Sequence, residues 1–438
     1  MAKFTRRDFL TTTAAAAAST AFPGLAAAAG TGTKLLHAPE KGAKLNVLRW
    51  HAFVQGDADQ WKVNTEKFTK QTGIPVKVDD VGWEDVRAKA ALAARVGSGP
   101  DIIISWFDDP EQFPDKLLDV SELGDYLGKK YGGWYDVCKR YGRHGGKWIA
   151  IPLGSNGNAI AYRESAVKAA GFDGVPKDLA GFLKLCQALK AKGTPAGFAF
   201  GHAVGDGNNF CHWLLWSHGG KVASPKGQVV LDTPETVAAL EYATQLYKTF
   251  IPGTLGWNDT SNNRAFLDNQ IFLTANGISL YYSAKTSKDP KMNAMAQDMA
   301  HSHFPVGASG KHTELMQISQ FMHFKYSKYP NAAKAYTQFM MEADQYNPWM
   351  ESSIGYVSQP LKAYEANPVW NDPKITVYRD STGIMLDNGY DGPLGAASAA
   401  VMANYVVVDM FAAAVSGSKT PKQAAAEAAE RAKRYYKS

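Results

Sequence analysis

Apolar and polar positions alternate along the first third of the chain with periods that predict strands and helices in turn. Strands are expected at 44–50, 74–79 and 101–105, and amphipathic helices are expected between them at 57–71 and 84–96. The last strand contains the continuous apolar run Ile102-Ile103-Ile104, which is typical of a strand buried on both faces of a parallel sheet. The order strand, helix, strand, helix, strand therefore predicts a doubly wound α/β domain.

A second series of helices and short strands follows residue 163. Its predicted elements lie at 178–191, 197–201, 232–250, 266–277, 331–343 and 424–437. Pro234 stands at the favoured first position of a helix, and residues 420–423, Thr-Pro-Lys-Gln, have the form of a capping box. No low-complexity linker occurs beyond the N-terminal segment. Two α/β units joined by short ordered crossings are therefore expected.

Residues 146–163 stand between the two series. The apolar runs Trp148–Leu153 and Ala159–Tyr162 flank a small polar centre that contains Asn156-Gly157. Local chemistry favours a hairpin here, because Asn-Gly between strand-like runs is a strong turn signal. The alternative is one extended segment that leaves the first unit and begins the second.

Residues 1–30 have the composition of an export signal. Arg6 and Arg7 precede an apolar, alanine-rich core, and small residues at 26–29 suit a cleavage site. The arginine pair resembles a twin-arginine signal, and an ordinary secretory signal is the alternative. No other apolar run is expected to span a bilayer, which takes about 20 residues. The mature chain is therefore expected to be soluble in the periplasm.

Charge and cysteine content exclude some classes of function. The formal charge is +6, and removal of the export signal leaves about +4, which is too mild to predict nucleic-acid binding. Cys138, Cys186 and Cys211 form no paired motif, so one disulfide is possible and one thiol is left over. Cys186 falls on the apolar face of a predicted helix and is expected to pack in the core.

Motifs for catalysis and metal binding are missing from the sequence. No nucleophile elbow, phosphate loop or H-E-x-x-H motif occurs. His202, Cys211 and His212 are expected in one loop, and His301-x-His303 is expected along a strand; neither spacing matches a zinc pattern. We therefore expect no catalytic residue, no metal and no cofactor.

Tryptophan follows each of the first three predicted strands. The three positions are Trp50-His51, Trp83, and Trp106 with Asp108 two residues later. Because ligands of such sheets bind outside the carboxyl ends of the strands, these indoles predict a binding surface.

Aromatic residues also occur with amides and hydroxyls in four later segments, at 202–213, 257–263, 276–282 and 355–360. Flat aromatic faces pack on the C–H faces of sugars, and amides and carboxylates bind hydroxyls. Together the segments indicate a neutral, hydroxyl-rich ligand.

A family resemblance follows from the order of several short motifs. The motifs are Gly97-Ser98-Gly99-Pro100-Asp101-Ile102-Ile103, Trp106-Phe107-Asp108, Trp148–Tyr162, Trp216-Ser217-His218-Gly219-Gly220 and Asn276-Gly277. In this order the chain, from about residue 45 to 360, resembles the family 1 extracellular solute-binding proteins of ABC importers, which include maltose- and oligosaccharide-binding proteins.

The resemblance implies a two-lobed periplasmic-binding-protein fold, with each lobe a sheet flanked by helices and with hinge closure on the ligand. It places the first lobe at 44–153 and 301–345 and the second at 154–300 and 346–438. It also favours the crossing over the hairpin at 146–163. The expected partners are a small carbohydrate and the transmembrane subunits of an ABC permease, and the protein is expected to be a monomer without nucleic acid.

The expected ligand contacts combine the strand-end residues with the later loops. Trp106 and Tyr281 are the candidates for stacking, and the resemblance places Asn156 where the family has a polar contact. After Asn276 the chain lacks the tryptophan often found in the family, which implies a sugar smaller than a long maltodextrin. The full expected set is Trp50, His51, Trp83, Trp106, Asp108, Asn156, Asn158, His202, Trp257, Asn276, Ser279, Tyr281, Tyr356 and Ser358. A charged solute, such as glycerol phosphate or a polyamine, and a secreted glycan-active enzyme remain the alternatives.

Overall fold

A computed structural model of the chain describes residues 33–436. Contacts divide the chain into Met1–Lys34 and Leu35–Ser438, and only the second unit is described below. The expected export signal at 1–30 lies outside the described residues.

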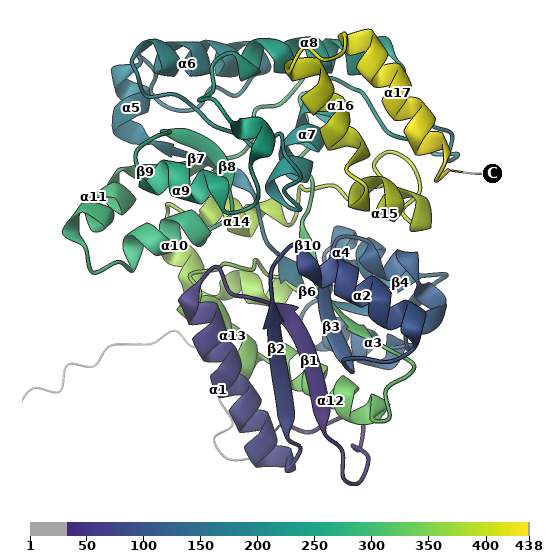
Figure 1. Cartoon of the computed structure of the whole chain (residues 1–438). Coiled ribbons are helices and arrows are strands. Elements are labelled where there is room, and N and C mark those ends of the chain that lie inside the picture. Colours follow the sequence, from purple (N-terminus) through teal and green to yellow (C-terminus); the bar gives the residue numbers. More distant parts are fainter. Residues whose placement is uncertain (1–32, 437–438) are drawn as a thin grey trace, which may run out of the picture. The chain divides into compact units, whose positions relative to one another are not determined.

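The larger sheet has five strands in the order β2-β1-β3-β10-β6 (Figure 1). Its strands are β1 (Leu45–Trp50), β2 (Val76–Val81), β3 (Ile102–Trp106), β6 (Ala150–Ser155) and β10 (Ile318–His323). β1 is parallel to β2 and β3, whereas β10 is antiparallel to β3 and β6. The α/β prediction is therefore confirmed, with an antiparallel strand added from far along the chain.

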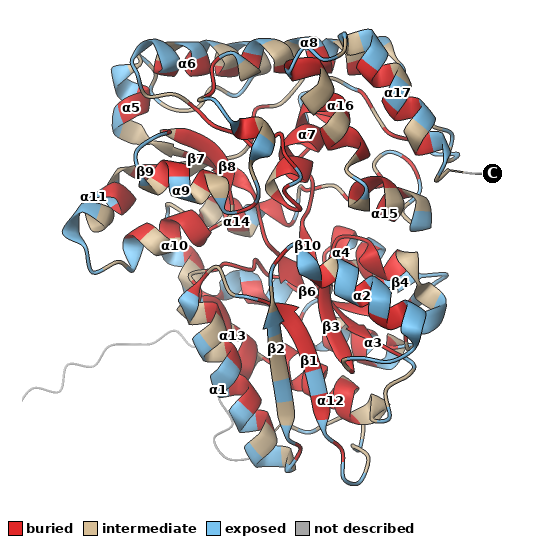
Figure 2. Cartoon of the chain, viewed as in Figure 1, coloured by how far each residue is buried: buried red, intermediate tan, exposed pale blue. Residues whose placement is uncertain are grey.

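The order β2-β1-β3 creates a crevice at one edge of this sheet. The connections α1 (Gln55–Thr72) and α2 (Asp85–Val96) run in opposite directions across the sheet. Because such connections are right-handed, the two helices belong on opposite faces, and the reversal opens a crevice at the carboxyl ends of β1 and β3. The wholly buried side chains of β3 fix the sheet between these helices (Figure 2).

Further helices complete the packing around the five strands. They are α3 (Ser121–Lys130), α4 (Asp136–Gly142), α12 (Pro330–Met341) and α13 (Ala343–Ser352). α13 packs on α1, where Asp57 accepts hydrogen bonds from Arg49 Nη2 at 2.5 Å and from Trp349 Nε1 at 2.7 Å. The buried Arg49–Asp57 pair thus joins β1, α1 and α13.

The smaller sheet has three strands in the order β8-β7-β9. β7 (Ala159–Arg163) lies in the centre and is antiparallel to β8 (Leu273–Asn276) and β9 (Met299–Ser302). The remaining helices of the chain from residue 164 onward are α5 (Glu164–Ala169), α6 (Leu179–Ala191), α7 (Asp206–Ser217), α8 (Pro234–Tyr247), α9 (Ser261–Leu267), α10 (Ser279–Lys285), α11 (Pro290–Asp298), α14 (Thr376–Ser381), α15 (Ala396–Ala403), α16 (Val406–Val415) and α17 (Pro421–Lys433).

Two local predictions in this region are wrong. The segment 197–201 forms no strand, and only the neighbouring Ala196 makes single backbone bridges. The expected loop at 202–213 is largely helix α7. The apolar side chains of α7 are buried almost all round, so tertiary packing overrides the weak helix propensity of its Asp, Gly and Asn residues.

The stretch 146–163 is a crossing and not an Asn-Gly hairpin. β6 pairs with β10 in the larger sheet, whereas β7 pairs with β8 and β9 in the smaller one. A short hairpin of β4 (Arg143–His144) and β5 (Lys147–Trp148) lies just before it. The crossing favoured by the family resemblance is therefore confirmed.

Backbone hydrogen bonds join this crossing to two other segments. The Ser155 N–H donates to Ser358 O at 2.9 Å, and the Ser358 N–H donates back to Ser155 O at 2.7 Å. The Asn156 N–H donates to Gln317 O at 2.8 Å. Gly154, at φ 148°, allows this approach, because a Cβ there would lie 2.3 Å from Ser358 O.

One described segment is long and apolar enough to cross a membrane, contrary to the expectation that no such run follows the N-terminal segment. It is Ala396–Val415, and 61% of its most apolar window is buried inside the protein. α15 and α16 are separate helices within it, divided at Asn404 and Tyr405. Packing against neighbouring helices therefore accounts for its apolar character.

All three cysteines are free and buried, so the possible disulfide is absent. Cys186 lies in α6 with no exposed surface, as its position on the apolar face predicted.

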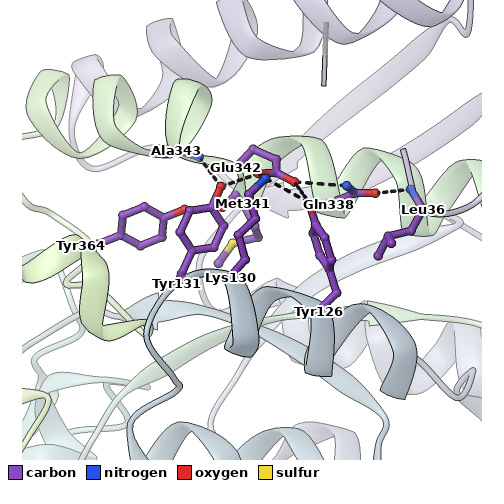
Figure 3. A network of polar contacts seen from close by, with 9 residues as sticks. All are labelled: Leu36, Tyr126, Lys130, Tyr131, Gln338, Met341, Glu342, Ala343 and Tyr364. Atoms are coloured by element: carbon purple, nitrogen blue, oxygen red, sulfur yellow. Dashed lines mark hydrogen bonds and ion pairs between the residues drawn. The ribbon is translucent and has the colours of Figure 1, made fainter. Parts of the chain in front are cut away.

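A buried carboxylate fixes the corner between α12 and α13 (Figure 3). Glu342 accepts hydrogen bonds from Lys130 Nζ at 2.5 Å, from Tyr126 Oη at 2.9 Å and from Tyr131 Oη. Burial and this carboxylate raise the pKa of Tyr131 to about 12. Gln338 also donates to Glu342, at 3.1 Å. The network ties α3 to the helices that lead toward Ser358.

Replacing Glu342 with Ala should lower the free energy of unfolding by about 1–3 kcal/mol, because the buried donors of Tyr131 and Gln338 lose an acceptor. Urea denaturation followed by circular dichroism measures this change. Glu66→Ala is the matched control, since Glu66 forms an exposed pair with Lys62 at 3.8 Å and should change stability by less than about 0.5 kcal/mol. Equal stability of Glu342→Ala and the parent protein would contradict the assigned role.

Candidate functional site

A pocket lies where the carboxyl ends of the larger sheet face the smaller sheet and the crossings between them. Its free volume is about 40 Å³, well below the range of about 300–1,000 Å³ for ligand pockets, so the lining must move apart before a ligand binds. Its lining residues are Phe53, Trp83, Asn156, Asp206, Asp259, Asn276, Gly277, Ser279, Gln317 and Tyr356.

Each part of the fold contributes to this lining. Phe53 follows β1 and Trp83 follows β2, as expected for the crevice of the larger sheet. Asn156 and Gln317 belong to crossings that are hydrogen-bonded to each other. Asn276 ends β8 of the smaller sheet. The pocket is therefore built by both sheets and by the segments that connect them.

The three strand-end tryptophans gather in one cluster, as their positions predicted. The ring centroids of Trp83 and Trp106 lie 3.8 Å apart in a stacked arrangement, and Trp50 lies 5.1 Å from Trp106. Trp50 and Trp106 have no exposed surface, and only Trp83 of the three lines the pocket. The two inner indoles therefore support Trp83 from behind.

Two carboxyl groups also line the pocket, Asp259 buried and Asp206 half-buried. Asp259 Oδ1 accepts hydrogen bonds from the backbone N–H groups of Gly205 at 2.9 Å and Asp206 at 2.8 Å. Burial raises the pKa of both Asp206 and Asp259, and the charge of Asp259 raises that of Asp206 further. Asn158 Nδ2 donates to Asp206 Oδ1 at 3.4 Å. These carboxyl oxygens are suited to accept hydrogen bonds from ligand hydroxyls.

Amide and hydroxyl groups form a network at the end of β8. Asn276 Nδ2 donates to Asn263 Oδ1, and Asn276 Oδ1 accepts from Ser279 Oγ at 3.3 Å. Asn156 Oδ1 accepts from Ser319 Oγ at 2.5 Å. The partners fix the orientation of the pocket amides before any ligand binds.

Several buried polar atoms at and around the pocket have no hydrogen-bond partner among residues 33–436. At the lining these are Trp83 Nε1, Asn156 Nδ2 and Asp259 Oδ2, and nearby they are Asn158 Oδ1 and Ser358 Oγ. An unsatisfied buried polar group costs about 1–3 kcal/mol, so these atoms favour a ligand that supplies both donors and acceptors.

Five of the expected ligand contacts line this pocket. They are Trp83, Asn156, Asn276, Ser279 and Tyr356. The others lie outside the lining, and their surroundings explain why.

Asp108 and Tyr281 are already hydrogen-bonded to other parts of the protein. Asp108 Oδ2 accepts from Asn388 Nδ2 at 2.7 Å and from Ser398 Oγ at 2.6 Å, and burial raises its pKa to about 7. Tyr281 Oη donates to Asp372 Oδ2 at 2.9 Å. Asp108 thus binds α15, and Tyr281 binds the segment before α14.

His51, His202 and Trp257 also lie outside the lining. His51 is exposed, and its backbone N–H donates to Val81 O at 2.7 Å. His202 Nε2 lies 2.7 Å from Asp409 Oδ1. Trp257 is half-buried against Gly197. Asn158 and Ser358 are buried next to the lining, and their unpartnered atoms keep them among the expected contacts.

Sequence reasoning did not assign the remaining lining residues. Asp206 lies within the segment 202–213, and Gly277 directly follows the expected contact Asn276. Phe53 follows Trp50 by three positions. Asp259 lies between the amides of the 257–263 segment. Gln317 carries no local signal, because its position depends on the pairing of β10 in the larger sheet.

Two sheets joined by crossings, with a pocket where they meet, define the two-lobed fold of solute-binding proteins. Maltose-bound MalE3 of T. maritima has this fold, with a TM-score of 0.77 and 19% identity over 90% of this chain and 100% of that one. A sugar transporter of Arthrobacter chlorophenolicus A6 with bound laminaribiose gives a TM-score of 0.76 and 17% identity over 90% and 99% of the chains.

The chain belongs to the bacterial extracellular solute-binding protein family, whose pattern residues 65–377 match. It is also 25% identical to the Escherichia coli (strain K12) protein YcjN, whose name places it among ABC transporter periplasmic-binding proteins. That similarity extends over 331 residues, or 70% of this chain and 71% of YcjN.

Replacing Asp206 with Asn should reduce the loss of stability as pH rises. An unfolded Asp releases its proton near pH 3.9, whereas folded Asp206 holds it to higher pH. Between these values the unfolded state binds fewer protons, so the free energy of unfolding falls by about 1.4 kcal/mol for each unit of pKa difference. Asparagine at this position has no proton to release in this pH range. The free energy of unfolding of the variant, minus that of the parent, should therefore rise with pH above about 4.

Urea denaturation of both proteins at several pH values between 4 and 8 measures this difference. Asp173→Asn, at an exposed carboxylate, is the control and should follow the parent profile. A constant difference between Asp206→Asn and the parent across the series would contradict the raised pKa.

Proposed function

We propose that this protein is the periplasmic binding component of an ABC importer and captures a monosaccharide, a short oligosaccharide or a derivative of one. The observation that carries the proposal is the pocket itself, in which the Trp83 face lies among amides, carboxyl groups and unpartnered polar atoms. Sugars present C–H faces to indoles and hydroxyls to such groups. The named ligands of the two structural neighbours are sugars, which agrees with this chemistry.

The charge of the pocket bears on the alternative ligands. Its ten lining residues include no Lys, Arg or His, so a phosphate group would lack a charged partner. The two carboxyl groups would attract a polyamine only when ionised, and burial opposes their ionisation. A neutral polyhydroxylated ligand therefore fits the pocket best.

The lining at the end of β8 supports a short ligand. The segment after Asn276 turns directly into α10 and provides the small Ser279 at the lining. The free volume of about 40 Å³ is far below that of ligand pockets, so the two lobes would separate to admit the ligand.

We propose Trp83 as the stacking surface and Asn156, Asn276, Ser279 and Tyr356 as contacts from the expected set. Phe53, Asp206, Asp259 and Gln317 are added from the lining. Asn158 and Ser358 would contact the ligand after a small adjustment, and Trp50 and Trp106 would act by supporting Trp83. The roles expected for Asp108, Tyr281, His51, His202 and Trp257 depend on rearrangement in the open or ligand-bound state.

The packing also supports a division into lobes with hinge closure. We propose a first lobe at 44–155 and 318–371 and a second at 159–302 and 374–436. The sequence-based bounds assigned α13 mostly to the second lobe, but its contacts with α1 favour the first. Gly56 N–H of α1 donates to Tyr282 Oη of α10 at 2.8 Å, which is a contact suited to hold the lobes closed.

Transport would require a permease in the membrane and export of this protein to the periplasm. We propose that the closed, ligand-bound monomer docks on the transmembrane subunits of the permease, without catalysing a reaction and without binding nucleic acid. Export through the twin-arginine route is part of the same proposal and rests on the N-terminal arginine pair.

Calorimetric titration of the mature protein with neutral mono- and disaccharides should identify a ligand that binds with 1:1 stoichiometry. Asn276→Ala should weaken that ligand by about 5- to 150-fold, which corresponds to about 1–3 kcal/mol for a lost buried hydrogen bond. Trp83→Ala should weaken it further through loss of stacking. Asn404→Ala is the control, because this exposed amide bonds only within its own helix region.

The same titrations separate the alternatives. Binding of glycerol phosphate or spermidine in place of any sugar would contradict the carbohydrate proposal, and release of product from a bound glycan would establish an enzyme. Unchanged sugar affinity in both Asn276→Ala and Trp83→Ala would refute the placement of the site. Small-angle X-ray scattering should show a smaller radius of gyration with ligand, and an unchanged radius would argue against closure.

A further inference from the structure

Two histidines and a glutamate converge in the long segment between β9 and β10. His303 directly follows β9, and His312 and Glu314 lie shortly before β10. These side chains offer donor atoms that all lie within 4.8 Å of one another. This cluster is separate from the pocket, whose lining includes none of the three residues.

The distances between the donor atoms approach those around a zinc ion. His312 Nδ1 lies 3.0 Å from Glu314 Oε1, and His303 Nδ1 lies 3.9 Å from the same oxygen. Ligands at about 2.0–2.2 Å from a tetrahedral Zn²⁺ are about 3.3 Å apart. Small side-chain rotations would therefore bring all three donors to bonding distance.

Glu314 is built into the protein as an anchor for such a site. The side chain is 3% exposed, and Oε1 accepts a hydrogen bond from the Phe304 N–H at 3.2 Å. The other oxygen, Oε2, is buried and has no hydrogen-bond partner among residues 33–436. A buried, partly unpartnered carboxylate is costly unless a donor or a cation approaches it.

The histidines complete a suitable set of ligands. Their side chains are 31% and 35% exposed, so an ion can reach them from solvent. A neutral imidazole is the form that binds a metal ion.

We propose that His303, His312 and Glu314 form a site for a divalent transition-metal ion, most suitably Zn²⁺, with water completing the coordination. Two imidazoles with one carboxylate suit Zn²⁺, whereas Mg²⁺ and Ca²⁺ prefer oxygen ligands. This departs from the expectation of no metal, because His303 meets His312 and Glu314 only through the fold of residues 304–311.

The position of the site predicts what the ion would do. Its ligands stand at both ends of residues 304–311, in one of the segments that connect the two sheets. Glu314 O also accepts the Leu386 N–H at 2.8 Å, so the site is tied to a second segment. Bound Zn²⁺ would close the loop at its base and stiffen this connection.

Titration of the chelator-treated mature protein with ZnCl₂ at pH 7.5, without sugar, tests the proposal by calorimetry. The expected result is one high-affinity site per chain and no comparable binding of MgCl₂. His303→Gln and Glu314→Gln should each weaken Zn²⁺ binding at least tenfold. His303 is partly exposed, and the amide introduced by Glu314→Gln retains an acceptor oxygen. Circular dichroism without metal would show that both variants fold.

His144→Gln is the matched control. His144 Nδ1 lies 2.7 Å from Glu111 Oε2, so this pair has the same chemistry but lacks a second histidine. Zinc binding should remain unchanged in this variant. Three outcomes would overturn the proposal. The first is that the parent protein has no high-affinity zinc site. The others are that zinc binding survives in both His303→Gln and Glu314→Gln, or that His144→Gln removes it. The sugar affinity of the same proteins is measured in separate titrations. The zinc proposal and the carbohydrate proposal can therefore fail independently of each other.

Discussion

The hydrogen bonds that join Ser155 to Ser358 and Asn156 to Gln317 are the constraint on which the pocket depends. They bring segments far apart in the sequence to one place between the two sheets. Gly154 permits this approach, because a side chain at that position would collide with the Ser358 carbonyl. Without these contacts, Asn156, Gln317 and Tyr356 would have no common position in the pocket.

The pocket combines a rigid aromatic wall with polar groups that are only partly satisfied. Trp83 is held by the stacked Trp106 behind it, so its exposed face is fixed before a ligand arrives. The amides of Asn156 and Asn276 have internal partners, whereas Asn156 Nδ2 and Asp259 Oδ2 keep unused hydrogen-bonding capacity. Preorganisation of this kind lowers the entropic cost of binding.

The sequence predicted the elements with strong local patterns. The apolar run of β3 and the alternation before it identified the α/β order, and the strand-end tryptophans were found together as expected. Helix α7 was missed because its polar first turn has weak helix propensity, and burial of Phe210 and Trp213 decides its structure. Gln317 could not be assigned because nothing local to it specifies the pairing of β10 with β3 and β6.

The expected stacking role of Trp106 illustrates a further limit. Strand-end position predicts which sheet edge an indole occupies, but it does not predict which indole of a cluster faces the ligand. That depends on how Trp50, Trp83 and Trp106 pack on one another, and the result places Trp83 at the pocket. Similarly, the Asp108 carboxylate lies at the expected edge but is used by Asn388 and Ser398.

We propose that the pocket between the two sheets holds a neutral carbohydrate. The test is to purify the protein from its native host under non-denaturing conditions, release the bound small molecule and identify it by mass spectrometry. One neutral mono- or short oligosaccharide per protein chain is the expected result. A phosphorylated solute or a polyamine in that amount, released in place of a sugar, would contradict it.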